Sequence, residues 1–268
     1  MLSPALAPFL GPLRDCYEAG VQVATLPAAR DDAEDMRLAA LFLKRALTDL
    51  RVVWLLVQTG YTAQAASVTS ALFEYSLAVV CVAGVPENVE KVLKAKEGKL
   101  PWSCVKMSKV LARNYQSQAP ERGGVFGQKE YEEAWRKIYG AYDFLCKIKH
   151  PTTRSAIHDA FSAPGEPGEF VVMVAPDVRQ EDLSMKVVVL SIAITRCYEA
   201  IRHFALRLEC EQTDHLRDFA QRMSDIMSDT ARAHQTVATG PLPFNVSDSW
   251  VQRELAELMA RADEQQGD

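Results

Sequence analysis

The 268-residue sequence has no excess of cysteine, glycine or proline, and the lack of such an excess excludes several classes of protein. Thirteen glycines and thirteen prolines rule out a collagen and a fully disordered chain. The six cysteines form no C-x-x-C pair, which argues against a disulfide scaffold, a redox motif or a zinc knuckle. They are scattered through apolar segments, which is typical of reduced thiols that pack as small hydrophobic groups. The six are Cys16, Cys81, Cys104, Cys146, Cys197 and Cys210.

The sequence also lacks the short motifs of the common enzyme classes. It contains no G-x-G-x-x-G, no G-x-x-x-x-G-K-[ST], no H-E-x-x-H and no G-x-S-x-G. We therefore expect no metal and no cofactor, and whether the protein is an enzyme stays open. With 48% apolar and 24% charged residues and a net charge of −5, the composition is that of a globular protein long enough to bury a large core.

Export and membrane signals are weak. The first 15 residues have no basic region, contain three prolines and reach Arg14 and Asp15 before an apolar stretch long enough for export, so we expect no signal peptide. Residues 63–85 approach the length of a membrane span but contain Glu74 and several hydroxyl side chains, which favours a buried core helix. We expect a cytoplasmic protein with no membrane partner.

Helical periodicity dominates the chain and sets the predicted fold class. Apolar residues recur at alternating steps of three and four over 31–58, 131–150 and, most clearly, 183–208, whereas 62–83 is apolar nearly all round. The sequence predicts an all-α bundle of about six to eight helices, with one short extended segment near 170–174. We expect one helical-bundle domain over 1–240, followed by a linker and an amphipathic helix in 241–268.

Helix boundaries are predicted from local signals. Asp31 followed by Glu34 is a capping pattern that predicts the start of the first long helix. Prolines 86 and 101 predict the starts of two shorter helices that reach about residues 97 and 113. Residues 209–233 continue the helical composition of 183–208 with a thinner apolar stripe.

Charge is unevenly distributed along the chain. Residues 91–154 hold 14 basic and 6 acidic side chains, although the whole protein is acidic. Such a segment is either a solvated lysine-rich face or a surface that meets RNA phosphates or an acidic partner. The candidate phosphate contacts are Lys91, Lys94, Lys106, Lys109 and Arg113.

Glu74 is the most unusual residue in its context, because nearly every neighbour in SALFEYSLAVVCV is expected to be buried. A buried carboxylate needs a cation or several hydrogen-bond donors. Glu74 is therefore either a binding residue or a structural one that pairs with an arginine or a tyrosine hydroxyl. Tyr142 and His150 are the other candidate binding residues: His150 either caps its helix or faces Glu74 in a pocket between helices.

A resemblance to a known group of proteins rests on two segments that precede the long helix of 183–208. They are WLLVQTGYTAQAASVTSALFEYSLAVVCVAG and YEEAWRKIYGAYDFLCKIKHP. Over residues 37–208 the chain resembles an uncharacterised group of bacterial helical proteins, classed as a domain of unknown function. In that group an arginine usually precedes the glutamate by four residues, whereas here that position is Ser70.

The chain also loosely resembles the HEPN superfamily of helical domains. Many of these are metal-independent ribonucleases or nucleotide-binding modules that act as dimers through an R-x(4 to 6)-H motif. Arg196 and His203 match this motif with six residues between them, about 10 Å apart along one helix. The resemblance would imply that His203 transfers a proton and that Arg196 stabilises phosphate charge, with His150 as a further candidate.

Three functions remain open on the sequence alone. The first is a cytosolic interaction module, homodimeric or bound to a protein partner, that uses the apolar stripe of 183–208. The second is a HEPN-like ribonuclease of a toxin or phage-defence system, with RNA as its partner. The third is a small-ligand-binding helical bundle centred on Glu74 and His150.

Overall fold

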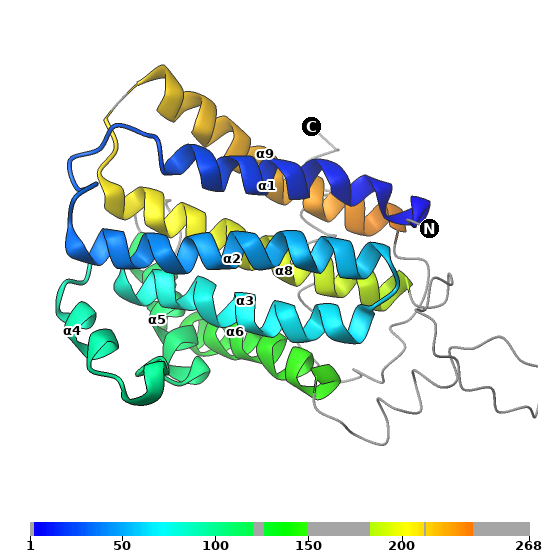
Figure 1. The fold of residues 1–268 in the computed structure, drawn as a ribbon, viewed down its shortest axis with the longest axis horizontal. Helices are drawn as coiled ribbons and strands as arrows, with labels where there is room; N and C mark the ends of the chain where they lie inside the picture. The colour runs from blue at the N-terminus through cyan, green and yellow to red at the C-terminus, as the bar shows by residue number, and fades with distance from the viewer. Residues whose placement is uncertain (1–2, 120–125, 150–182, 212, 238–268) are drawn as a thin grey trace, which may run out of the picture.

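A computed structural model describes residues 3–119, 126–149, 183–211 and 213–237 (Figure 1). Within these ranges the chain forms eight α-helices, which confirms the predicted all-α bundle. His150, the extended segment expected near 170–174 and the helix expected in 241–268 lie outside the described residues. The elements are η1 (Pro4–Phe9), α1 (Leu10–Val23), α2 (Glu34–Gln58), α3 (Thr62–Val82), α4 (Glu87–Leu93), η2 (Lys96–Gly98), α5 (Cys104–Gln118), α6 (Gln128–Lys149), α8 (Leu183–Leu208) and α9 (Asp214–Val237).

Helices α2, α3 and α8 form the centre of the bundle. Helices α2 and α3 are an antiparallel pair joined by a tight turn at Gly60, whose φ of 88° suits glycine. Helix α3 packs against α2, α5, α6 and α8, which explains why its sequence is apolar nearly all round. It is also long and apolar enough to cross a membrane, but 72% of its most apolar window is buried within the protein.

The remaining helices cover this centre from two sides. Figure 1 shows α1 and α9 side by side above α8 and α2, whereas α5 and α6 pack together against α3 on the opposite side. Helix α8 contributes its whole apolar stripe to this core, from Leu183 to Leu208. The stripe is buried within the chain, and the homodimer expected from it stays a prediction.

Two loops meet at the end of the bundle where α1 leads to α2 and α8 leads to α9. Ala28 and Cys210 form an isolated antiparallel bridge there. Arg30 donates to both carboxylate oxygens of the buried Asp35, at 3.0 and 2.9 Å, and the backbone N–H of Gly84 donates to the same carboxylate at 2.8 Å. Asp35 therefore ties the start of α2 to the end of α3.

Several predicted boundaries were wrong. Helix α2 begins at Glu34 after Ala33, with no side-chain cap, so Asp31 does not form the expected capping box. Helix α5 starts at Cys104 rather than at Pro101, because the Ser103 hydroxyl caps it by accepting the backbone N–H of Lys106 at 3.4 Å. The helical stretch after 208 is a separate helix, since Glu209 takes a left-handed conformation with φ of 56°.

Candidate functional site

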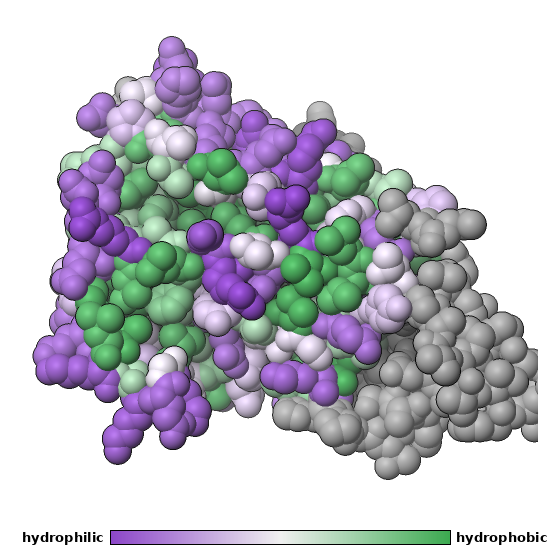
Figure 2. Space-filling view, in the orientation of Figure 1, coloured by the Kyte–Doolittle hydropathy of each residue, from purple (hydrophilic) through white to green (hydrophobic). Residues whose placement is uncertain are grey.

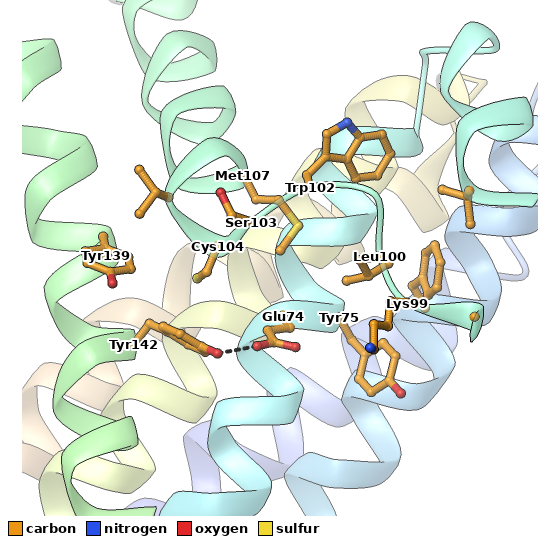
Figure 3. Close-up of a pocket in the computed structure, with 14 residues that line it drawn as sticks. Glu74, Tyr75, Lys99, Leu100, Trp102, Ser103, Cys104, Met107, Tyr139 and Tyr142 are labelled. Carbon is orange, nitrogen blue, oxygen red and sulfur yellow. Dashed lines mark hydrogen bonds between the residues drawn. The ribbon is translucent and has the colours of Figure 1, made fainter. Parts of the chain in front are cut away.

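A pocket of about 600 Å³ opens between α2, α3, α5 and α6, with Glu74 on its wall (Figure 3). This volume lies within the range of small-molecule sites, roughly 300–1,000 Å³. The lining residues are mostly aromatic or apolar: Phe42, Glu74, Tyr75, Val92, Gly98, Lys99, Leu100, Trp102, Ser103, Cys104, Val105, Met107, Tyr139 and Tyr142.

Local sequence patterns place the main side chains of the pocket. Glu74 and Tyr75 sit on the half-buried face of α3, beside the fully buried Phe73. Tyr139 and Tyr142 are three residues apart on α6 and therefore share one face of that helix. The Ser103 cap turns the chain into α5 and brings Trp102 and Cys104 to the rim and wall of the pocket.

Glu74 and Tyr142 form the polar centre of the site. The Tyr142 hydroxyl donates a hydrogen bond to Oε1 of Glu74 (Figure 3). Burial, and after it the hydrogen bond to the Glu74 carboxylate, raises the pKa of Tyr142 well above its usual value. The phenol is thus a persistent donor and no general base. Of the two partners weighed for Glu74, an arginine or a tyrosine hydroxyl, the structure supplies the tyrosine.

Aromatic rings flank this polar centre on two sides. Phe42 and Tyr75 stack with their ring centroids 6.2 Å apart and an interplanar angle of 27°. On the other side the Tyr142 ring lies 6.2 Å from Tyr139 and 5.7 Å from the buried Phe73. A carboxylate among aromatic faces is an environment that favours a cationic group.

Cations of the protein itself do not neutralise Glu74. Among the residues that the structure describes, no lysine or arginine nitrogen lies within 4 Å of its carboxylate. The pocket-lining Lys99 is exposed and pairs with Glu97 at 2.6 Å. Within the described ranges, the Tyr142 hydroxyl is therefore the donor that the structure supplies to the Glu74 carboxylate.

The Cys104 thiol in the pocket wall is unreactive. Burial, followed by the negative charge of Glu74, raises the pKa of Cys104 well above that of a free thiol. Cys104 therefore stays protonated at neutral pH and is no nucleophile. In the described part of the chain, no group of three or more His, Cys, Asp and Glu side chains is placed to hold a metal ion.

The two residues of the R-x(4 to 6)-H match lie on α8, outside the pocket. Arg196 and His203 are 6% and 3% exposed and both face α3. Burial, and after it the charges of Arg207 and Arg202, lowers the pKa of His203 to about 4, and its ring bonds the backbone carbonyl of Ala83. The structure does not bring this pair together with Glu74 and Tyr142, and their catalytic role stays a prediction.

The candidate phosphate contacts are divided between two helices. On α4, Lys91 bonds the Asn88 side chain and Lys94 pairs with Glu90. On α5, Lys106 and Arg113 are exposed, whereas Lys109 is half-buried. The Lys109 ammonium lies 4.7 Å from the centroid of the Trp135 ring. RNA binding by these residues stays a prediction.

Helix α2 carries three exposed apolar side chains. Leu41, Val52 and Leu55 are exposed at 64%, 37% and 58%, and Figure 2 shows apolar side chains in two groups with hydrophilic ones between them. Isolated exposed leucines are common on soluble proteins. The homo-oligomer or protein partner expected from the sequence is neither shown nor excluded by this face.

Sequence reasoning found Glu74 and Tyr142 but missed the rest of the pocket. The sequence analysis did not identify Phe42, Tyr75, Trp102 or Tyr139 as site residues. The signal that could have identified Phe42 is its position beside, and not within, the apolar stripe of Ala39 and Leu43.

Comparisons with protein-family models, with characterised proteins and with solved structures found no match to this chain.

Proposed function

We propose that the protein binds a small organic cation, such as a protonated amine, in the Glu74 pocket. The observation that carries this proposal is a carboxylate on the wall of a 600 Å³ aromatic pocket with no lysine or arginine within 4 Å among the described residues. A half-buried carboxylate of this kind is stabilised by a cation that arrives with the ligand. This function corresponds to the ligand-binding bundle that the sequence left open.

Each part of the pocket has a role in this proposal. Tyr142 occupies Oε1 of Glu74 and fixes the orientation of the carboxylate, which leaves the second oxygen for the ligand ammonium. The rings of Tyr139 and Trp102 offer faces to the cation and to the apolar body of the ligand. The Tyr75 ring stacks on Phe42 and already lies 5.8 Å from the guanidinium carbon of Arg45, so it contributes apolar surface. The raised pKa values of Tyr142 and Cys104 favour binding over acid, base or nucleophilic chemistry.

The interaction module and the HEPN-like ribonuclease remain alternatives. Cleavage of RNA by the purified protein, abolished by His203→Ala, would favour the ribonuclease. The ribonuclease mechanism would not use the Glu74 pocket, because Arg196 and His203 are buried and do not line it.

Isothermal titration calorimetry with a matched pair of compounds tests the proposal. We use 2-phenylethylamine and 2-phenylethanol, which differ mainly in the cationic group. Wild-type protein is expected to bind the amine at least about tenfold more tightly than the alcohol, a difference worth about 1.4 kcal/mol. Glu74→Gln should remove this preference, because the amide still accepts the Tyr142 hydroxyl but carries no charge.

A matched control is Glu90→Gln, which removes an exposed carboxylate on α4 that does not line the pocket. This variant should keep the wild-type preference for the amine. Equal affinities of wild-type protein for amine and alcohol, or no saturable binding of either, would overturn the proposed function.

A further inference from the structure

Arg196 is a buried cation without a partner. Its side chain is 6% exposed, and it forms no hydrogen bond or ion pair within the part of the chain that the structure describes. Its Nη1 atom is fully enclosed with no acceptor. The guanidinium carbon lies 5.4 Å from the centroid of the Phe73 ring, which is its closest described interaction.

This arrangement is unfavourable for the free protein. A buried charge is normally paired and hydrogen-bonded, and a cation–π contact recovers only a part of the lost hydration. Neither of two candidate carboxylates pairs with Arg196: Glu74 accepts the Tyr142 hydroxyl through Oε1, and Glu199 pairs with Arg202 at 3.5 Å, although its Oε2 atom is buried without a hydrogen-bond partner. Among the described residues no carboxylate pairs with Arg196, so its guanidinium is available to an anion that arrives with a ligand.

Arg196 lies directly behind the wall of the Glu74 pocket. The Phe73 ring that it covers packs against the ring of the pocket residue Tyr142, with centroids 5.7 Å apart. The thiol of Cys104, another wall residue, is close enough to both Glu74 and Arg196 to sense both charges. One turn further along α5 lies the buried hydroxyl of Ser108, which is close enough to the Cys104 thiol to act on its pKa.

We propose that the ligand of this pocket is zwitterionic, with a cationic group on Glu74 and a carboxylate or similar small anion on Arg196. Arg196, Phe73 and Ser108 do not line the pocket, so the anionic end reaches Arg196 by displacing the buried Phe73 ring, and Ser108 then offers it a second donor. This inference rests on the proposed function, since it assigns the second charge of the same ligand. The site would then select molecules that carry both charges over molecules that carry one.

The test is a calorimetric comparison of three series of compounds with equal chain lengths. They are linear alkylamines, linear carboxylates, and ω-amino acids from 4-aminobutanoate to 8-aminooctanoate. In wild-type protein at least one ω-amino acid is expected to bind about tenfold more tightly than the amine of equal length. Arg196→Gln should abolish this advantage by weakening the binding of the ω-amino acid, whereas the affinity for the amine should not fall, because the variant removes a positive charge behind the pocket wall.

A matched control is Arg202→Gln on the same helix, whose guanidinium already has Gln118 and Glu199 as partners. It should retain the zwitterion advantage. If amines bind but no ω-amino acid binds more tightly, the inference about Arg196 is overturned and the proposed function stands. If no amine binds, the proposed function is overturned and this inference with it.

Thermal unfolding without ligand gives a second readout. Because the unpaired cation is a cost to the free protein, Arg196→Met should leave the Tm unchanged or raise it. A loss of more than about 4 °C would identify Arg196 as a structural residue that the bundle requires, and would contradict its role as an anion receptor.

Discussion

The hydroxyl of Tyr142 on α6 donates a hydrogen bond to the carboxylate of Glu74 on α3, and this bond joins two helices across the pocket. We expect Tyr142→Phe to reduce the free energy of unfolding by about 1 to 2 kcal/mol, because a donor to a charged acceptor is lost and the carboxylate remains half-buried. Urea denaturation measures the change. Tyr139→Phe, which removes a hydroxyl from the same helix face without this bond, is the control. Equal losses in the two variants would show that the bond to Glu74 contributes nothing specific.

Two buried histidines predict how stability depends on pH. Burial lowers the pKa of His234 to about 4, and burial together with Arg207 and Arg202 lowers the pKa of His203 to about 4. Above about pH 6.5 both are neutral in the folded and the unfolded chain, and they contribute no pH dependence. Between pH 6.5 and 4 the unfolded chain binds protons that the folded chain does not, so stability falls as the pH falls.

The expected slope from each histidine is on the order of 1 kcal/mol per pH unit in that window. Chemical denaturation at pH 7.5, 6 and 5 measures it in wild-type protein and in a His203→Gln, His234→Gln double variant, which should show a shallower decline. His215→Gln, at an exposed position on α9, serves as the control and should keep the wild-type slope. A double variant as acid-sensitive as wild type would refute this explanation.

Asp35 is predicted to be a strong stabilising residue. It accepts two bonds from Arg30 and one from the Gly84 backbone while being 2% exposed. Asp35→Asn removes the charge that compensates Arg30, and we expect a loss of about 2 to 4 kcal/mol in the free energy of unfolding. Asp32→Asn, which breaks an exposed pair with Arg37, should change stability by less than about 0.5 kcal/mol. Similar losses in both variants would contradict this account.

Gly84 tests the role of backbone conformation at the end of α3. Its φ is 78°, and a Cβ atom there would lie 2.7 Å from Cδ of Arg207. Gly84→Ala should therefore combine backbone strain with a steric clash and cost about 2 to 3 kcal/mol. Gly98→Ala is a matched control, because Gly98 also has a positive φ, 66°, but open space around its Cα. It should cost about 1 kcal/mol, and an equal loss in both variants would show that the Arg207 contact is irrelevant.

The helical framework could be predicted from the sequence because its cause is local. The three-and-four spacing of apolar residues identified α2, α6 and α8, and the apolar α3 was correctly placed at the bundle centre. The break between α8 and α9 was not predicted, since Glu209 takes a left-handed conformation that sequence patterns associate with glycine. Helix α1 was also missed, because its stability comes from packing on α9 and not from a strong local signal.

The site was predicted only in part, for a physical reason. Glu74 is conspicuous because a carboxylate in an apolar helix needs a cation or a hydrogen-bond donor beside it. The sequence of that one helix is enough to show this. The pocket around it is assembled from side chains that are far apart in the chain, such as Phe42, Trp102 and Tyr139. Their convergence depends on tertiary packing, and so does the isolation of Arg196 from every carboxylate in the described residues.

A crystal structure of the protein with 2-phenylethylamine would test the central claim most directly. The account predicts the ammonium nitrogen about 2.7 to 3.2 Å from the free oxygen of Glu74, with the Tyr142 hydrogen bond retained and the ligand ring among the pocket aromatics. An empty pocket at saturating amine, or an amine bound away from Glu74, would contradict it.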